Sequence, residues 1–207
     1  MNLYPIFVKL DNQECAVFGG GMVAERKVRT LLDYGCHVTV VSPDLSPGLF
    51  GLWESGKIVC HYRTYRSGDV EGYRLVISAT NDADVNRQIF EEAHRRGVLI
   101  NVVDNPSLCD FYVPSIVRRG DLQLAISTTG QSPALAREIR KMLERIFDDS
   151  YAKGLNIAGQ IRDRLKHEVP DENKRKQLIN EVVVPKILAG IRNGNVDQVK
   201  YELQEWI

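Results

Sequence analysis

A short apolar segment that runs into three consecutive glycines constrains the fold of this 207-residue chain more than any other feature. Residues 15–18 are apolar, and Gly19, Gly21 and Ala24 then follow the pattern Gly-x-Gly-x-x-Ala. Glycine allows a sharp turn and a close approach of the backbone to a phosphate, and a small third residue lets a helix pack closely on a strand. The pattern predicts a strand, a tight turn and a helix whose N-terminus binds a pyrophosphate, with Gly19 and Gly21 at a dinucleotide cofactor. A plain strand-helix turn with no ligand is the alternative, because the motif alone is a weak signal.

Strands and helices alternate from this motif onward. The helix expected over residues 22–34 ends at Gly35, and Asn81 or Asp82 caps a helix that Gly97 closes. The expected strands are apolar throughout, which is typical of a parallel sheet covered on both faces. These strands lie at residues 16–18, 37–41, 57–62, 74–79 and 98–103, with a short helix near residues 50–53. The fold class is therefore α/β: a doubly wound parallel sheet of the Rossmann type, with residues 1–113 as an NAD-binding domain.

The pattern changes after this domain. Two strands are expected there, at residues 111–119 and 122–127. An amphipathic helix capped by Ser132 follows them. A hairpin and one helix cannot bury their apolar faces alone, so we expect residues 114–150 to form a dimerisation region and the chain to form a homodimer. Residues 151–207 are expected to form a helical C-terminal domain with breaks at Pro170 and Pro185.

Composition and residue spacing argue against several classes of protein. The chain has 27 Lys plus Arg and 27 Asp plus Glu, and this zero net charge argues against a nucleic-acid partner, because such proteins carry a basic excess. The four cysteines and four histidines show no paired ligand spacing, so no metal site is expected. The sequence shows no signal-peptide pattern and no apolar stretch long enough to span a bilayer. We therefore expect a cytoplasmic protein with no membrane partner.

The loops after the second and fourth expected strands supply further candidates for cofactor contacts. Ser42 and Asp44 follow the second strand, where a polar side chain meets the adenosine ribose in this fold. No Arg or Lys lies near them to bind a 2′-phosphate, which favours NAD over NADP. Thr80 follows the fourth strand and is expected to contact the cofactor beside a helix cap. For Asp44, a solvent-exposed loop position is an equally good interpretation.

Asp104 is the candidate for the chemistry, because it directly follows the fifth expected strand. Ligands of open parallel sheets bind at the carboxyl ends of the strands, so a carboxylate there can accept a proton beside a nicotinamide. Residues 104–107 read Asp-Asn-Pro-Ser, and such residues favour turns, so a turn is the competing interpretation. The two roles are compatible.

A loop rich in hydroxyl groups, together with nearby arginines, suggests an anionic substrate. The loop residues are Ser127, Thr128, Thr129 and Gly130. They precede the expected helix, where hydroxyl and backbone N–H groups can bind carboxylates. Arg118 and Arg137 are close in sequence, and guanidinium groups pair well with carboxylates. For each charge taken singly, a solvated surface position is the alternative.

Six segments within the first 145 residues form a specific combination. They are residues 3–7 (LYPIF), 17–27 (VFGGGMVAERK), 79–82 (ATND), 101–104 (NVVD), 111–115 (FYVPS) and 125–137 (AISTTGQSPALAR). In this order they resemble the siroheme synthase N-terminal family, the precorrin-2 dehydrogenases. The later helices match that family only in general character.

The resemblance implies oxidation of precorrin-2 to sirohydrochlorin with NAD, so these tetrapyrroles are the expected small-molecule ligands. Some members also insert Fe2+ to give siroheme, which makes Fe2+ a candidate second substrate. The resemblance further implies a dimer with an NAD domain, an interlocked dimerisation region and a helical tail. It assigns the chemistry to Asp104 and cofactor contacts to Met22, Val23, Pro43 and Asp44.

A non-catalytic NAD-sensing module, such as a regulatory domain, is the alternative function. Its glycine loop would look the same, but it would need neither Asp104 nor the basic residues between 118 and 141.

Some relatives carry a modifiable serine where this chain has Thr128, which leaves that kind of regulation open.

Overall fold

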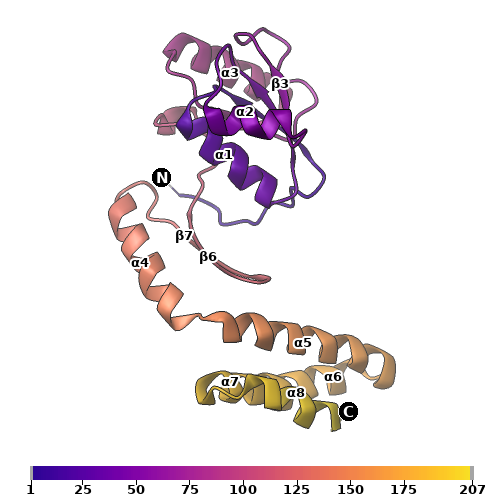
Figure 1. The fold of residues 1–207 in the computed structure, drawn as a ribbon. Helices are drawn as coiled ribbons and strands as arrows, with labels where there is room; N and C mark the ends of the chain where they lie inside the picture. The colour runs from indigo at the N-terminus through magenta and orange to yellow at the C-terminus, as the bar shows by residue number, and fades with distance from the viewer. Residues whose placement is uncertain (1, 206–207) are drawn as a thin grey trace. The chain divides into compact units, whose positions relative to one another are not determined.

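The computed structural model describes residues 2–205, which form two compact units. One unit is Tyr4–Val113, and the other comprises residues 114–205 together with residues 2 and 3. Figure 1 colours the chain by residue number and labels its α-helices and some of its strands. Among the described residues, no helix is long and apolar enough to cross a membrane.

A five-stranded parallel sheet forms the centre of the Tyr4–Val113 unit. Its strands are β1 (Glu14–Phe18), β2 (His37–Val41), β3 (Val59–His61), β4 (Leu75–Ser78) and β5 (Leu99–Val102). They pair in the order β3-β2-β1-β4-β5, so Val17 of β1 lies between Val40 and Ile77. The chain runs outward from β1 to β3 and then crosses to β4, which confirms the predicted doubly wound sheet.

The third strand is shorter than the predicted span of residues 57–62. β3 is an edge strand, and it pairs only with the stretch of β2 from Thr39 to Val41. The flanking Ile58 is buried in the core without belonging to the strand. The apolar side chain of Ile58 is therefore explained by its burial, because Ile58 does not pair in the sheet.

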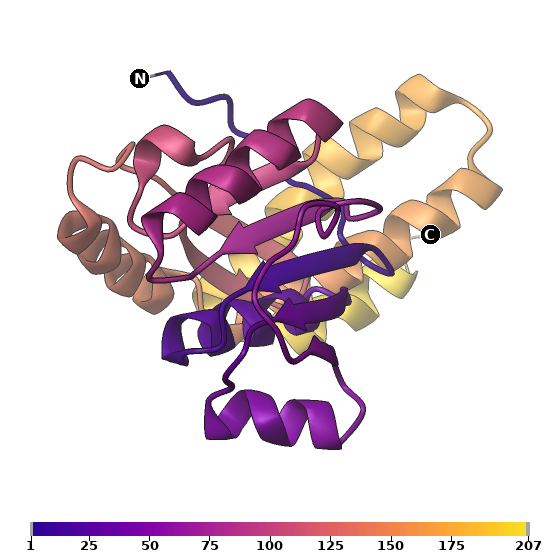
Figure 2. The ribbon, with the colours of Figure 1, turned by 90° about the horizontal axis from the view of Figure 1, so that it is seen from above.

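Helices cover both faces of this sheet. They are α1 (Met22–Asp33), α2 (Pro47–Glu54) and α3 (Ala83–Arg96), and a 3-10 turn, η1 (Pro106–Leu108), follows β5. α1 and α2 pack on the face that carries Val17 and Ile77, whereas α3 packs on the face of Phe18 and Ile100. Figure 2 shows α2 and α3 on opposite sides of the strands. Burial on both faces explains why successive strand residues are apolar.

The helix ends follow the predicted caps. The Ser46 hydroxyl accepts a backbone N–H at the start of α2, and the Asp82 carboxylate accepts two at the start of α3. Gly97 closes α3 with a φ of 67°, in the left-handed region. α1 differs, because its N-cap residue is Gly21 and no side chain caps the helix.

A hairpin, five α-helices and one π-helical turn form the described part of the second unit. The elements are β6 (Ser115–Arg119), β7 (Leu122–Ile126), α4 (Pro133–Ile146), α5 (Asp149–Glu168), α6 (Glu172–Leu178), η2 (Ile179–Val183), α7 (Val184–Asn193) and α8 (Val196–Glu205). The hairpin is antiparallel, as predicted, although its first strand begins at Ser115 and not at residue 111. Apolar residues of α5, α7 and α8, among them Leu165, Ile187 and Leu203, form a separate core. The hairpin and all these helices belong to one compact unit, and a further division at residue 150 stays a prediction.

One of the two predicted helix breaks is wrong. Pro170 does separate α5 from α6, but Pro185 lies inside the first turn of α7. The preceding residues 179–183 form a π-helical turn, so the chain stays helical from Glu172 to Asn193. Proline lacks an N–H and its ring crowds the carbonyl four residues earlier. The wider π turn changes the hydrogen-bond pattern at this point and accommodates the ring.

Candidate active site

The carboxyl ends of the parallel strands border a cleft of about 840 Å³ in the Tyr4–Val113 unit. It lies where the strand order reverses, which is where open α/β sheets bind ligands. All nine residues that the sequence assigned to the cofactor and the chemistry line it. They are Gly19, Gly21, Met22, Val23, Ser42, Pro43, Asp44, Thr80 and Asp104.

Gly21 provides the part of the cleft that suits a phosphate group. It is the N-cap of α1, and a Cβ added to it would meet no atom within 4 Å. The first N–H groups of α1 lack a side-chain partner there and lie at the positive end of the helix dipole. Met22 and Val23 begin the helix with exposed apolar side chains. This arrangement fits the pyrophosphate of a dinucleotide.

The two preceding glycines let the backbone pass close to neighbouring loops. Gly19 has a φ of 113°, and a Cβ on it would lie 2.5 Å from the carbonyl oxygen of Ala79. A Cβ on Gly20 would overlap the carbonyl oxygen of Asp44 and lie 2.7 Å from the Ser42 Oγ. Gly20 was not among the predicted cofactor residues, because its role depends on a tertiary contact that the motif does not show.

Hydrogen bonds shape the loop that follows β2. The Ser42 hydroxyl is buried and donates to the carbonyl oxygen of Asp44 at 2.7 Å. The backbone N–H of Ser46 donates to the carbonyl oxygen of Gly20 at 2.7 Å. The Ser42 side chain therefore orders the loop, and the exposed carboxylate of Asp44 is the group available to a ribose. Among the described residues that line the cleft there is no Lys or Arg, which matches the predicted preference for NAD.

Thr80 is held in the wall of the cleft by a residue outside the predicted set. Its hydroxyl lies 2.8 Å from the Asn86 Oδ1, and the Asn86 amide donates to the Thr80 carbonyl oxygen at 3.2 Å. The Ser78 hydroxyl donates to the same Asn86 oxygen at 2.6 Å. Asn86, on α3, therefore fixes the backbone that leaves β4 at the cleft.

Asp104 lies at the β5 end of the cleft and is also an inner residue of a turn. Its φ is 59°, and the N–H of Asn105 donates to the carbonyl oxygen of Val102 at 3.2 Å. The position therefore suits both roles that the sequence left open. Lys27, half-buried on α1, lies within electrostatic range of this carboxylate. Burial lowers the pKa of the Lys27 ammonium, and the Asp104 charge partly offsets that effect.

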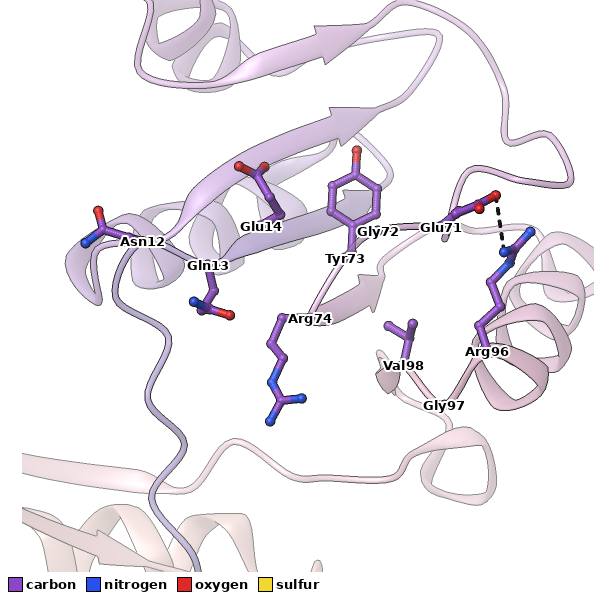
Figure 3. A pocket seen from close by; sticks show the side chains of 10 residues that line it. All are labelled: Asn12, Gln13, Glu14, Glu71, Gly72, Tyr73, Arg74, Arg96, Gly97 and Val98. Atoms are coloured by element: carbon purple, nitrogen blue, oxygen red, sulfur yellow. Dashed lines mark ion pairs between the residues drawn. The ribbon is translucent and has the colours of Figure 1, made fainter.

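A second hollow, of about 510 Å³, lies at the amino-terminal edge of the same sheet. Its lining includes Arg74 and Arg96, balanced by Glu14 and Glu71. Figure 3 shows Glu14 and Tyr73 pointing to one side and Arg74 pointing to the other, while Arg96 pairs with Glu71 at 3.2 Å. Because these side chains do not converge on one point, the cleft at the carboxyl edge is the better candidate.

The predicted substrate loop lies in the second unit, ahead of α4. The Ser127 hydroxyl accepts the N–H of Thr129 at 3.1 Å, and the Thr128 hydroxyl accepts the N–H of Ser132 at 3.2 Å. Thr129 and Gly130 have left-handed φ values of 52° and 81°. These hydroxyls accept bonds that order the loop and keep their own O–H groups as donors, and their contact with a ligand stays a prediction.

The two predicted arginines lie on different elements of the second unit, β6 and α4. Arg137 is exposed on α4, five residues after the cap of that helix. Arg118 pairs with Gln123 near the turn of the hairpin, about 13 Å of strand away from Ser127. Among the described residues, no three His, Cys, Asp or Glu side chains are grouped to bind a metal ion.

Two further residues that the sequence did not predict line the cleft. Thr64 and Tyr65 line it, and they belong to the long segment between β3 and β4. That segment carries no motif and no periodic pattern, so no signal in the sequence marks these residues. Only the tertiary path of the segment brings them to the cofactor cleft.

Comparisons with known families agree with this geometry. The model of a family described as putative NAD(P)-binding matches residues 6–115, which is more than half of the chain. The chain belongs to this family. A second model, described as sirohaem biosynthesis protein central, matches residues 119–146. The predicted NAD cofactor is confirmed by the first match.

Siroheme synthases resemble the chain over most or all of its length. The identity is 35% over 207 residues for the protein of Chromobacterium violaceum, 37% over 205 for that of Methylobacillus flagellatus and 40% over 187 for that of Nitrosospira multiformis. These alignments include 100%, 99% and 88% of this chain but only 44%, 44% and 40% of the relatives. The chain thus spans less than half their length, and the predicted resemblance to siroheme synthases is confirmed.

The fold is shared with a solved structure. SirC, a precorrin-2 dehydrogenase, superimposes with a TM-score of 0.79 over 98% of this chain and 100% of its own. The sequences are 23% identical, so this similarity concerns the fold. It confirms the predicted combination of a parallel sheet, a hairpin and C-terminal helices.

Proposed function

We propose that this chain oxidises precorrin-2 to sirohydrochlorin with NAD, as a step in siroheme biosynthesis. The observation that carries the proposal is the cleft at the carboxyl edge of the sheet, which joins the glycine turn at Gly21 to the carboxylate of Asp104. One end of this cleft fits the pyrophosphate of a dinucleotide, and the other end offers a proton acceptor. The siroheme synthases that match along the chain supply the class of substrate.

Each part of the cleft has a task in this proposal. The start of α1 at Gly21 would bind the pyrophosphate, and the Asp44 carboxylate would accept hydrogen bonds from the adenosine ribose. Bound NAD+ supplies the hydride acceptor. Asp104 would take the proton that precorrin-2 loses as its conjugation extends, so the macrocycle gives up one hydride and one proton. Its exposed position at the cleft leaves room for a large substrate.

The carboxylates of the tetrapyrrole need cationic and N–H partners. The loop at Thr129 and Gly130 leads into α4, and Arg137 follows on that helix. The Ser127 and Thr128 hydroxyls accept in the bonds within the loop, so their O–H groups can still donate to a carboxylate, and Arg137 adds a cationic partner. Arg118 would act at a separate point of the macrocycle or from a second copy of the chain.

A homodimer is part of the proposal. α4 exposes a stripe of apolar side chains: Leu135 is 54% exposed, Met142 61% and Ile146 58%. These positions recur at helical spacing on one face, and such a face needs a partner. A second copy of the chain would cover this stripe.

Anaerobic incubation with precorrin-2 and NAD+ tests the function. We expect sirohydrochlorin absorbance and NADH to rise together, and a much slower reaction with NADP+. The alternative, an NAD-sensing module, predicts NAD binding with no affinity for a tetrapyrrole. Insertion of Fe2+, which the family resemblance implies for some members, requires its own assay with sirohydrochlorin and Fe2+ against a no-enzyme control.

A further inference from the structure

Glu92, on α3, is a buried carboxylate that the proposed reaction does not use. It is only 2% exposed and lies on the α3 face of the sheet. Burying a carboxylate is costly unless charged or polar groups satisfy it. Three donors do so here. They are the Tyr65 hydroxyl at 2.5 Å, the Gly68 backbone N–H at 3.0 Å and the Arg96 Nε at 2.9 Å.

Two of these donors belong to the segment of residues 64–68, which follows β3 and contributes Thr64 and Tyr65 to the cofactor cleft. This 64–68 segment has no helix or strand of its own. Gly68 has a φ of 104°, which a residue with a side chain rarely adopts. That conformation directs the Gly68 N–H to the Glu92 carboxylate. Glu92 therefore attaches an otherwise irregular segment to a rigid helix.

The hydrogen bond from the Tyr65 hydroxyl to Glu92 also fixes the aromatic ring of Tyr65. The ring packs edge-on against Phe18 at 5.6 Å between centroids, and Phe18 is fully buried at the end of β1. Both residues border the cleft. Burial and the bond to Glu92 raise the pKa of the Tyr65 hydroxyl, so it remains a donor at neutral pH. The ring thus has a packing partner on one side and a hydrogen-bond partner at its tip.

The strand order indicates which half of the dinucleotide this wall meets. β3 lies beside β2, whose loop carries Asp44, and β5 with Asp104 lies at the opposite side of the sheet. We propose that Glu92 is a positioning residue for NAD. It fixes Tyr65 and the 64–68 segment, and these residues form the wall of the cleft that contacts the adenosine half. This inference concerns cofactor binding and does not depend on the reaction proposed above.

Calorimetric titration of the full chain with NAD and with ADP-ribose tests the proposal, because ADP-ribose lacks the nicotinamide. Glu92→Ala is expected to raise the Kd of both ligands about tenfold, and Glu92→Gln, which keeps only one of the two acceptor oxygens, is expected to raise them severalfold. Glu91→Ala is the matched control, since Glu91 is the exposed neighbour on the same helix.

Three further readouts keep the test decisive if Glu92→Ala does not fold. Tyr65→Phe removes only the hydroxyl and should raise both Kd values severalfold. In a double-mutant cycle, Glu92→Gln and Tyr65→Phe should be non-additive, because they act on one hydrogen bond. Amide hydrogen exchange of residues 64–68 should quicken in Glu92→Gln and slow again when NAD binds. Unchanged Kd values for ADP-ribose in Glu92→Gln and Tyr65→Phe, with both variants folded, would overturn the proposal.

Discussion

Gly20 and Asp44 touch through their backbones: a Cβ on Gly20 would overlap the carbonyl oxygen of Asp44. The Ser46 N–H donates to the Gly20 carbonyl oxygen at 2.7 Å and holds the two loops together. The turn that would bind the pyrophosphate and the loop that would bind the ribose therefore position each other. This backbone contact sets the distance between the two proposed binding points of the cofactor.

Gly20→Ala and Gly21→Ala should fail in different ways. The methyl group at residue 20 has no room, so we expect a loss of roughly 1–3 kcal/mol in the free energy of unfolding. The methyl group at residue 21 has space in the protein but would occupy the proposed phosphate position. Gly21→Ala should keep its stability and lose at least tenfold in NAD affinity. Urea unfolding and NAD titration of both variants measure the contrast, and equal NAD affinity for Gly21→Ala and the unmodified chain would contradict it.

Asp104→Asn should separate the chemistry from the fold. Asn tolerates the left-handed conformation that Asp104 adopts, at a φ of 59°, but it cannot accept a proton. We expect kcat to fall by about 100-fold or more, with the Kd for NAD unchanged. Asp104→Ala also removes the base and adds backbone strain, so it should lose stability as well. A kcat for Asp104→Asn within threefold of the unmodified chain would rule out the role as a base.

Glu25 makes the first unit sensitive to acid. A hydrogen bond from Ser46, at 2.7 Å, and one from Arg29 lower the pKa of the Glu25 carboxyl below its ordinary value. A group whose pKa is lower in the folded state stabilises it fully above the unfolded pKa, and that stabilisation is lost as the pH falls through the folded pKa. Ser46→Ala should therefore cost about 1 kcal/mol at pH 7 through the lost α2 cap and should reduce the dependence of stability on pH in acid. Urea unfolding at neutral and acid pH measures both effects, and an identical pH dependence in the variant would contradict this assignment.

The apolar stripe of α4 predicts the oligomeric state. Met142→Glu places a charge in its centre, so we expect the homodimer to dissociate at concentrations where the unmodified chain stays dimeric. Sedimentation velocity measures the change. Glu144→Gln is the matched control, because Glu144 pairs with Arg140 on the opposite face of the same helix. A monomeric unmodified chain would refute the dimer itself.

Local signals predicted most of the fold. The cap at Asp82, the close at Gly97 and the apolar strands each depend on residues adjacent in sequence, so the sheet and its helices followed from the sequence. Pro185 misled the prediction because a π turn upstream accommodates it, and nothing in the local pattern marks such a turn. The observed strand ends also differ from the predicted ends where the neighbouring strand offers no further pairing partner, as at β3.

The candidate site was predictable only where a motif marks it. Gly21 and Asp104 follow strands directly, so their place at the carboxyl edge of the sheet could be inferred from connectivity. Gly20 and Tyr65 matter through contacts with residues distant in sequence, Asp44 and Glu92, which only the tertiary structure shows. Residues that position a site are in general harder to predict than residues that meet its ligand.

Anaerobic mixing of the chain with excess precorrin-2 and a limiting amount of NAD+ tests the central claim most directly. The account predicts one NADH for each sirohydrochlorin formed, a reaction that stops when NAD+ is exhausted, and its near absence in Gly21→Ala. Sirohydrochlorin that forms without NADH, or NAD that binds with no oxidation of precorrin-2, would contradict it.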